Sequence, residues 1–333
     1  MNHFKRYVIL GGDGVFGIYM AKYLLEKTDA ERVICVGRNP RKHPAYTLDV
    51  GKGDPRFKYY QIHLTFEQDF LFEMFDKEKP ECIMNFAALA YATSWTKAYR
   101  YYETNVVALA KMTEEIRKRD YFKHWMQIGS SEVYGSSDKA PAREDTPPNP
   151  TSPYSVSKLA GDQHLLTYWN TLKFPTNIIR PSNAYAPGQQ LYRVWPRAAY
   201  CAVTGQKLPL QGGGMVEKSY IHATDMARAI HLITEKAPRG KIYNAGTEKA
   251  TKIRHLIKLT AQAAGLTFEQ LADITPGRVG EDARYWLDSS EILKDCGWKP
   301  EIPLEQGADE MIAWARKYKD FLATEPLEYT LHA

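Results

Sequence analysis

The chain has 333 residues, of which 44% are hydrophobic and 25% are charged, and its formal net charge is +5. This is ordinary globular composition, with length enough for one large domain and a smaller lobe. The mild charge does not indicate nucleic-acid binding, and no apolar run approaches membrane-spanning length. The four cysteines contain no CxxC pair, so neither a metal site nor a disulfide framework is expected. We therefore expect a soluble, reduced, cytoplasmic protein that binds neither nucleic acid nor membranes.

A glycine-rich turn follows the first expected strand. Residues 7–10 form a short apolar run suited to a buried parallel strand, and residues 15–25 have the apolar spacing of a helix. Between them, Gly11 permits a tight turn, Gly14 lets a pyrophosphate approach the backbone, and Gly17 allows close packing of helix and strand. The helix begins at Val15 and Phe16 and offers its unpaired N–H groups to phosphates. This pattern predicts a dinucleotide site.

The second expected strand, residues 32–36, ends where an acidic residue would bind the adenosine ribose of NAD. The chain has Gly37 and Arg38 at that point, with Arg41 and Lys42 just beyond. A guanidinium can pair with a 2′-phosphate in forked geometry. The sequence therefore favours NADP over NAD as the cofactor.

Strand and helix patterns alternate through the first half of the chain, as in a doubly wound sheet. Further strands are expected at residues 58–62, 81–86, 124–128 and 176–179, and helices at 66–77, 97–119 and 152–172. We expect an α/β fold in which residues 1–180 form a Rossmann-type domain with a doubly wound parallel sheet. Residues 181–333 should form mainly a smaller, mixed α/β substrate lobe, with some segments returning to the Rossmann domain.

Tyr154 and Lys158 stand four residues apart at the start of the helix expected at 152–172. At this spacing the two side chains share one face of a helix. A neighbouring ammonium and the positive charge of an oxidised nicotinamide favour the phenolate of a tyrosine. Such a tyrosine can take the proton of a hydroxyl group while hydride leaves the carbon. The pair therefore predicts an oxidation step next to the dinucleotide.

These segments resemble the extended short-chain dehydrogenases/reductases of the nucleotide-sugar epimerase/dehydratase family. The resemblance rests on the glycine-rich turn and on further motifs in the same order: Asn85-Phe-Ala-Ala88, Asn105, Gly129-Ser-Ser-Glu-Val-Tyr-Gly135, Tyr154-x-x-x-Lys158, Arg180-Pro-Ser-Asn-Ala-Tyr185, Tyr243-Asn-Ala-Gly246 and Gly297-Trp-Lys-Pro300. It implies catalytic roles for Ser130, Tyr154 and Lys158. It also implies that Ala87, Ala88, Asn105, Tyr154 and Lys158 lie at the cofactor, together with the glycine-rich turn and Arg38.

The resemblance implies a reaction through a 4-keto sugar, and Glu132 favours one outcome. The 4,6-dehydratases of the family carry a glutamate at this position as the base at C5, and simple 4-epimerases usually do not. Ser131 makes the segment more similar to GDP-mannose 4,6-dehydratases and UDP-glucuronate decarboxylases than to the dTDP-glucose enzymes. A 4,6-dehydratase is therefore the preferred prediction. A 4-epimerase, a UDP-glucuronate-type decarboxylase and a one-way NADP(H)-dependent 4-dehydrogenase/reductase remain open, as does a non-catalytic dinucleotide-binding regulator.

The resemblance also implies a nucleotide-diphosphate sugar as substrate and a homodimer. The dimer would form through a four-helix bundle that pairs residues 97–119 and 152–172 of each copy. Residues expected to contact the substrate are Ser131, Asn183, Lys207, Arg278 and Arg284, and guanidinium groups suit its phosphates. His63 stands where the family usually has an aspartate near adenine, and the loop at residues 89–95 lacks the family's common His and Asp, so an atypical sugar pocket is expected.

Overall fold

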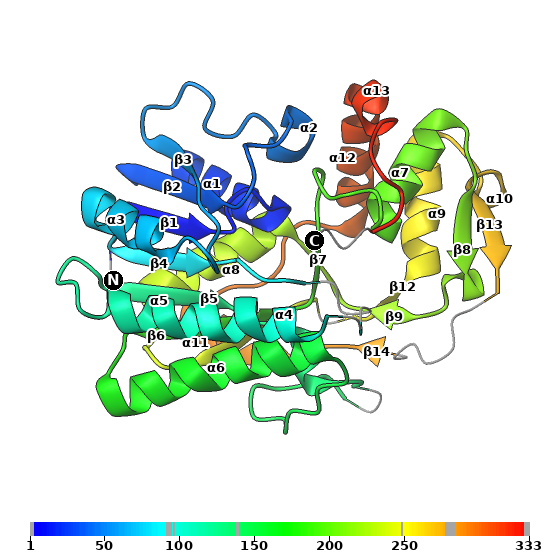
Figure 1. The fold of residues 1–333 in the computed structure, drawn as a ribbon. Helices are drawn as coiled ribbons and strands as arrows, with labels where there is room; N and C mark the ends of the chain where they lie inside the picture. The colour runs from blue at the N-terminus through cyan, green and yellow to red at the C-terminus, as the bar shows by residue number, and fades with distance from the viewer. Residues whose placement is uncertain are drawn as a thin grey trace.

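The computed structural model describes residues 3–90, 95, 97–137, 140–247, 249–276 and 284–329. Its centre is a parallel seven-stranded sheet in the order β11-β6-β5-β4-β1-β2-β3. These strands are Arg6–Leu10 (β1), Arg32–Gly37 (β2), Phe57–Gln61 (β3), Cys82–Asn85 (β4), His124–Ile128 (β5), Thr176–Pro181 (β6) and Ile242–Ala245 (β11). Helices cover both faces (Figure 1). The predicted Rossmann-type doubly wound fold is confirmed.

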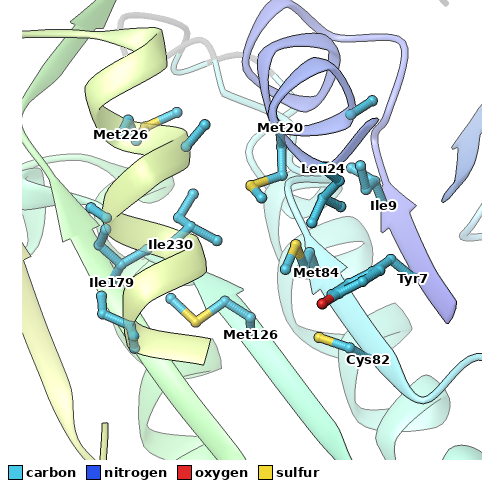
Figure 2. Close-up of a cluster of buried hydrophobic side chains, with 14 of the residues drawn as sticks. Tyr7, Ile9, Met20, Leu24, Cys82, Met84, Met126, Ile179, Met226 and Ile230 are labelled. Atoms are coloured by element: carbon cyan, nitrogen blue, oxygen red, sulfur yellow. The ribbon is translucent and has the colours of Figure 1, made fainter. Parts of the chain in front are cut away.

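Successive residues of each strand face opposite sides of the sheet and enter two different cores. Tyr7 and Ile9 pack with helices α1 (Val15–Lys27), α8 (Ala223–Lys236) and α11 (Ser290–Cys296). Figure 2 shows part of this cluster, in which Met20 and Leu24 from α1 approach Ile9 and Met84 of the sheet. Val8 and Leu10 pack on the opposite side with α3 (Gln68–Glu78), α5 (Ala108–Ile116) and α6 (Pro153–Leu172). Both faces of the sheet are thus buried, which explains the nearly continuous apolar strands.

The helix predicted at 97–119 is interrupted. It consists of α4 (Tyr99–Tyr102), a π-helical turn η1 (Glu103–Val107) and α5, in direct succession. Such π-turns occur frequently at functional sites. Here the turn carries Asn105, which the sequence placed at the cofactor.

Most of the chain beyond β6 forms a smaller, mixed α/β region beside the sheet (Figure 1). Three helices, α7 (Val194–Thr204), α9 (Ile253–Ala264) and α12 (Leu304–Lys317), build its core. Around them lie two short helices, α10 (Phe268–Leu271) and α13 (Lys319–Leu322), and three small sheets. Two of these sheets have two strands each: β7 (Asn183–Tyr185) pairs with β10 (Tyr220–His222), and β8 (Leu208–Gln211) pairs with β13 (Ala272–Thr275). In the third sheet, β9 (Glu217–Lys218) pairs with both β12 (Thr251–Lys252) and β14 (Arg284–Tyr285). Strand β11 leaves this region and pairs with β6 at the edge of the main sheet.

A short helix after β2, α2 (Pro44–Thr47), joins the sheet to the C-terminal helices. The indole Nε1 of Trp314 donates to the carbonyl oxygen of Ala45 at 2.7 Å, and the hydroxyl of Tyr46 donates to Glu325 at 2.6 Å. The His43 ring stacks on Phe321 with centroids 3.7 Å apart. These contacts fix the smaller region against the segment that follows β2, beside the predicted dinucleotide site.

None of the helices in the described ranges is both long enough and apolar enough to cross a membrane. All four cysteines are buried and unpaired.

Candidate active site

The glycine-rich turn lies at the point where the strand order reverses. From β1 the sheet continues through β2 on one side and β4 on the other, and ligands of such sheets bind at this crevice. Gly11 has φ +75°, and a Cβ there would lie 2.8 Å from the backbone nitrogen of Ala87. A Cβ on Gly17 would lie 2.6 Å from the carbonyl oxygen of Gly11. Only glycine therefore fits at these two positions, because the neighbouring groups are backbone.

The turn opens onto a cavity of about 290 Å³. Five residues predicted from the sequence line it, namely Gly11, Gly14, Arg38, Ala87 and Ala88. Its walls also include Asp13, Lys42, His63 and Phe66, and the rings of His63 and Phe66 are stacked with centroids 4.6 Å apart. The N-cap of α1 is Gly14, which provides no side-chain cap for the N–H groups of the first turn at Val15 and Phe16. Glycines without room for a side chain and an uncapped helix start fit a dinucleotide pyrophosphate.

Asn105 supports this cavity from behind. Its Oδ1 accepts the backbone N–H of Leu89 at 3.0 Å, and its Nδ2 donates to the carbonyl oxygen of Leu89 at 3.2 Å and to Ser157 Oγ at 2.9 Å. Leu89 itself lines the cavity. The Asn105 side chain therefore ties the loop after β4 to α6. The sequence did not predict this role.

The predicted catalytic residues meet beyond the carboxyl end of β5. Ser130 follows this strand and caps the 3₁₀ turn η2 (Ser131–Tyr134), its Oγ accepting the N–H of Glu132 at 3.2 Å. Tyr154 lies in the first turn of α6 and is only 9% exposed. Burial and the negative charge of Glu132 raise the pKa of Tyr154, whereas a hydrogen bond with Ser130 lowers it. The hydroxyl, the phenol and the carboxylate thus influence one another directly.

Lys158 is anchored to the end of β5. Its Nζ donates to the carbonyl oxygen of Ile128 at 2.6 Å. Burial lowers the pKa of Lys158 to about 8, and the charge of Asp162 opposes this shift. Burial is the largest influence on Tyr154 and raises its pKa, so the predicted ionisation near neutral pH would need positive charges close to the phenol.

A buried network holds α6 in place behind the site. Asp162, one turn after Lys158, accepts a hydrogen bond from Arg180 Nε at 2.9 Å, and Arg180 Nη1 donates to the hydroxyl of Tyr134 at 2.8 Å. That hydroxyl donates to Asn244 Oδ1 at 2.9 Å. Charge-assisted hydrogen bonds of this kind are stronger than neutral ones. They connect α6, β6, η2 and β11, so the predicted catalytic side chains stand on a rigid base.

The residues predicted to contact the substrate are more scattered. Ser131 is buried next to the catalytic serine, and the Nδ2 of Asn183 approaches the carbonyl oxygen of Ser219 at 3.5 Å. Lys207 is exposed just before β8, and Arg284 belongs to β14. Arg278 lies outside the described residues.

Sequence reasoning missed Arg193. It is the N-cap of α7, and its positive charge lowers the pKa of Tyr154, so the guanidinium lies within electrostatic reach of this phenol. No motif singled it out, because only the fold brings the start of α7 close to the start of α6.

The chain is similar to known proteins over most of its length. A family model described as GDP-mannose 4,6 dehydratase matches residues 8–311. A dTDP-D-glucose 4,6-dehydratase of Homo sapiens is 28% identical over 326 residues, which cover 94% of this chain and 90% of the relative. A dTDP-glucose 4,6-dehydratase structure from Streptomyces venezuelae, solved with NAD bound, has a TM-score of 0.86 and 25% identity over 95% of this chain and 98% of its own. A UDP-glucose 4-epimerase structure from Thermotoga maritima shares the fold, with a TM-score of 0.82 and 23% identity over 94% of this chain and 99% of its own.

Proposed function

This chain belongs to the GDP-mannose 4,6-dehydratase family, and from that premise we propose that it is an NAD(P)-dependent nucleotide-sugar 4,6-dehydratase. The observation that carries the proposal is the position of Glu132, whose charge acts on the buried Tyr154 next to Ser130. A hydroxyl, a phenol and a carboxylate in one site provide acid–base groups for two proton transfers. An oxidation at one carbon followed by an elimination at its neighbours needs both.

The glycine-rich turn, the N-terminus of α1 and the loop after β4 would hold the dinucleotide. When bound, its nicotinamide supplies the acceptor for hydride from C4 of the sugar and the donor that returns it at C6. Tyr154 takes the proton of the C4 hydroxyl, and Ser130 hydrogen-bonds that oxygen. Because burial raises the pKa of Tyr154, the positive charges of Arg193 and of the bound cofactor are needed to favour its ionised form.

Glu132 performs the elimination. The new C4 carbonyl acidifies the neighbouring C5–H bond, and the carboxylate of Glu132 removes that proton. The C6 hydroxyl then departs as water when it is protonated, and the newly formed carboxylic acid of Glu132 is the nearby donor. Return of hydride to C6 and of a proton from solvent to C5 completes a 4-keto-6-deoxy sugar. Tyr154 releases to solvent the proton that it took from the C4 hydroxyl, so the enzyme is left unchanged.

The nucleotide-diphosphate half of the substrate would extend toward the smaller region. Its expected contacts are Asn183, Lys207, Arg278 and Arg284, with Ser131 at the sugar. Arg193, whose charge acts on Tyr154, adds a positive charge near the sugar. The choice between NADP and NAD depends on the residues that face the adenosine ribose. The positive charge of Arg38 favours the 2′-phosphate of NADP, and the negative charge of Asp13 disfavours that phosphate.

Exposed apolar side chains on α4, η1 and α6 support the homodimer through a four-helix bundle. Tyr99 is 58% exposed, Val107 48% and Val156 38%, on segments that lie side by side (Figure 1). Large apolar groups gathered on an exposed surface often mark an interface. Light scattering should give the mass of a dimer for the wild type and of a monomer for Val107→Lys/Val156→Lys; a monomeric wild type would contradict the proposal.

The reaction is tested by incubating the enzyme with GDP-mannose, dTDP-glucose, UDP-glucose and UDP-glucuronate in heavy water, followed by mass spectrometry. We expect one substrate to lose a water molecule and to gain one deuterium. A change of configuration without loss of water would replace the proposal with a 4-epimerase, and loss of carbon dioxide would replace it with a decarboxylase.

A further inference from the structure

At the end of β2, neighbouring side chains crowd the position of the acidic residue that usually binds the adenosine ribose. A Cβ on Gly37 would lie 2.6 Å from the hydroxyl oxygen of Tyr59 and 3.2 Å from Cβ of Asp13. The Tyr59 hydroxyl is held there by a hydrogen bond to the carbonyl oxygen of Asn39 at 2.5 Å. The space that an acidic residue at position 37 would occupy is therefore taken by Tyr59 and Asp13. One of these two residues carries a carboxylate.

Asp13 is buried and poorly compensated. It is 6% exposed, and within the described part of the chain neither carboxylate oxygen has a hydrogen-bond partner. Its neighbouring cation is Lys42, whose Nζ lies 3.9 Å from Oδ2 and donates instead to the backbone oxygen of Asp13 at 3.0 Å. A buried carboxylate that lacks hydrogen bonds is costly, and this cost is relieved when a ligand supplies donors. Asp13 lines the same cavity as Gly11, Gly14 and Arg38.

We propose that the Asp13 carboxylate accepts hydrogen bonds from the adenosine ribose hydroxyls and so makes the site select NAD over NADP. This inference rests on the proposed dinucleotide-dependent function. The two ribose hydroxyls of NAD are the donors that the carboxylate lacks. The 2′-phosphate of NADP would remove one of these donors and bring negative charge close to Asp13.

Arg38, the residue that favoured NADP in the sequence, is a weaker influence. Its side chain is exposed, so water and salt screen its attraction for a phosphate. Asp13 is buried, where the same charge acts much more strongly. Lys42 is close enough to Asp13 to offset part of the negative charge of the carboxylate. This reduces the preference for NAD over NADP but does not reverse it.

Isothermal titration calorimetry with the purified protein, freed of bound nucleotide, tests the proposal. The wild type should bind NAD at least about tenfold more tightly than NADP. Asp13→Asn and Asp13→Ala should weaken NAD binding by roughly tenfold to a hundredfold, the range for a hydrogen bond to a charged group. Both variants should also reduce or reverse the preference for NAD over NADP. Asp49→Asn is the matched control, because Asp49 is 43% exposed and forms an ion pair with Lys52. It should change neither affinity.

A second measurement does not depend on how the variants fold. The wild type should bind 2′-deoxy-NAD about tenfold or more weakly than NAD, since one donor to Asp13 is missing. Tighter binding of NADP by the wild type, an unchanged ratio in both Asp13 variants, or equal binding of NAD and its 2′-deoxy analogue would overturn the inference and leave the proposed dehydratase standing. Failure of the wild type to bind either dinucleotide would overturn both.

Discussion

The surroundings of Tyr154 and the cavity beside the glycine-rich turn are built differently. Near Tyr154 the buried charges have protein partners: Lys158 donates to Ile128, and Asp162 pairs with Arg180. In the cavity, Asp13 is buried without a hydrogen-bond partner among the described residues. Catalytic groups must be held in position before the substrate arrives. A binding group can instead leave its hydrogen bonds to the ligand. The difference fits the two proposals, in which groups held in place near Tyr154 perform the chemistry and the Asp13 carboxylate selects the dinucleotide.

The largest expected effect is a loss of catalysis without a loss of dinucleotide binding. Tyr154→Phe removes the group that takes the hydroxyl proton, so kcat should fall by about 10²–10⁴-fold. The affinity for the dinucleotide should change little, because the glycine-rich turn and Asp13 are untouched. Steady-state kinetics and calorimetry measure the two quantities. The control is Tyr7→Phe, which changes a second buried tyrosine, in the core between the sheet and helices α1, α8 and α11. This variant should keep its activity. Substantial turnover by Tyr154→Phe would remove this residue from the mechanism.

The next effect concerns pH and Lys158. Its pKa falls from 10.5 to about 8 on folding, so between these values the unfolded chain binds more protons than the folded one. The free energy of unfolding should therefore rise with pH across this window, relative to a variant without the group. At about 1.4 kcal/mol per pKa unit, the rise is about 3 kcal/mol.

Denaturant unfolding of the wild type and Lys158→Met at several pH values isolates this contribution. The difference between their pH profiles should grow from pH about 8 upwards and level off above the ordinary lysine pKa. Parallel profiles would mean that Lys158 keeps an ordinary pKa, and that the site is better solvated than the structure indicates.

A smaller effect tests the glycine-rich turn. Gly11→Ala meets both a positive φ and the backbone of Ala87, whereas Gly53→Ala meets a positive φ with open space around it. Gly11→Ala should destabilise the protein by about 1–3 kcal/mol more than Gly53→Ala, because only the first is overpacked. Dinucleotide affinity should fall only in the first. Equal stability and affinity of the two variants would show that the loop after β4 does not need this close approach.

Much of the fold followed from the sequence, because its signals are local. The strand at β1, the glycines and the start of α1 are consecutive, and Tyr154 and Lys158 share one helical turn. Asp13 also lies in the predicted turn, but its significance depends on its approach to Gly37 on another strand. Arg193 reaches Tyr154 only through the packing of the smaller region against the sheet. Such contacts between distant segments leave no periodicity or motif in the sequence.

The raised pKa of Tyr154 has the same origin. The sequence shows a lysine four residues away, but burial and the approach of Glu132 depend on how η2 and α6 meet. Residue spacing in the sequence identified Tyr154 and Lys158, and the fold determined which charges act on the Tyr154 phenol.

The most direct test of the account follows the bound dinucleotide in Glu132→Gln by rapid-mixing absorbance. With a nucleotide sugar that the wild type dehydrates, Tyr154 should still permit oxidation at C4, while elimination at C5 should be blocked. We predict that reduced nicotinamide accumulates in this variant and that the dehydrated product forms at least about a hundredfold more slowly than in the wild type. Dehydrated product at the wild-type rate, or no reduced nicotinamide at all, would contradict the assignment of oxidation to Tyr154 and elimination to Glu132.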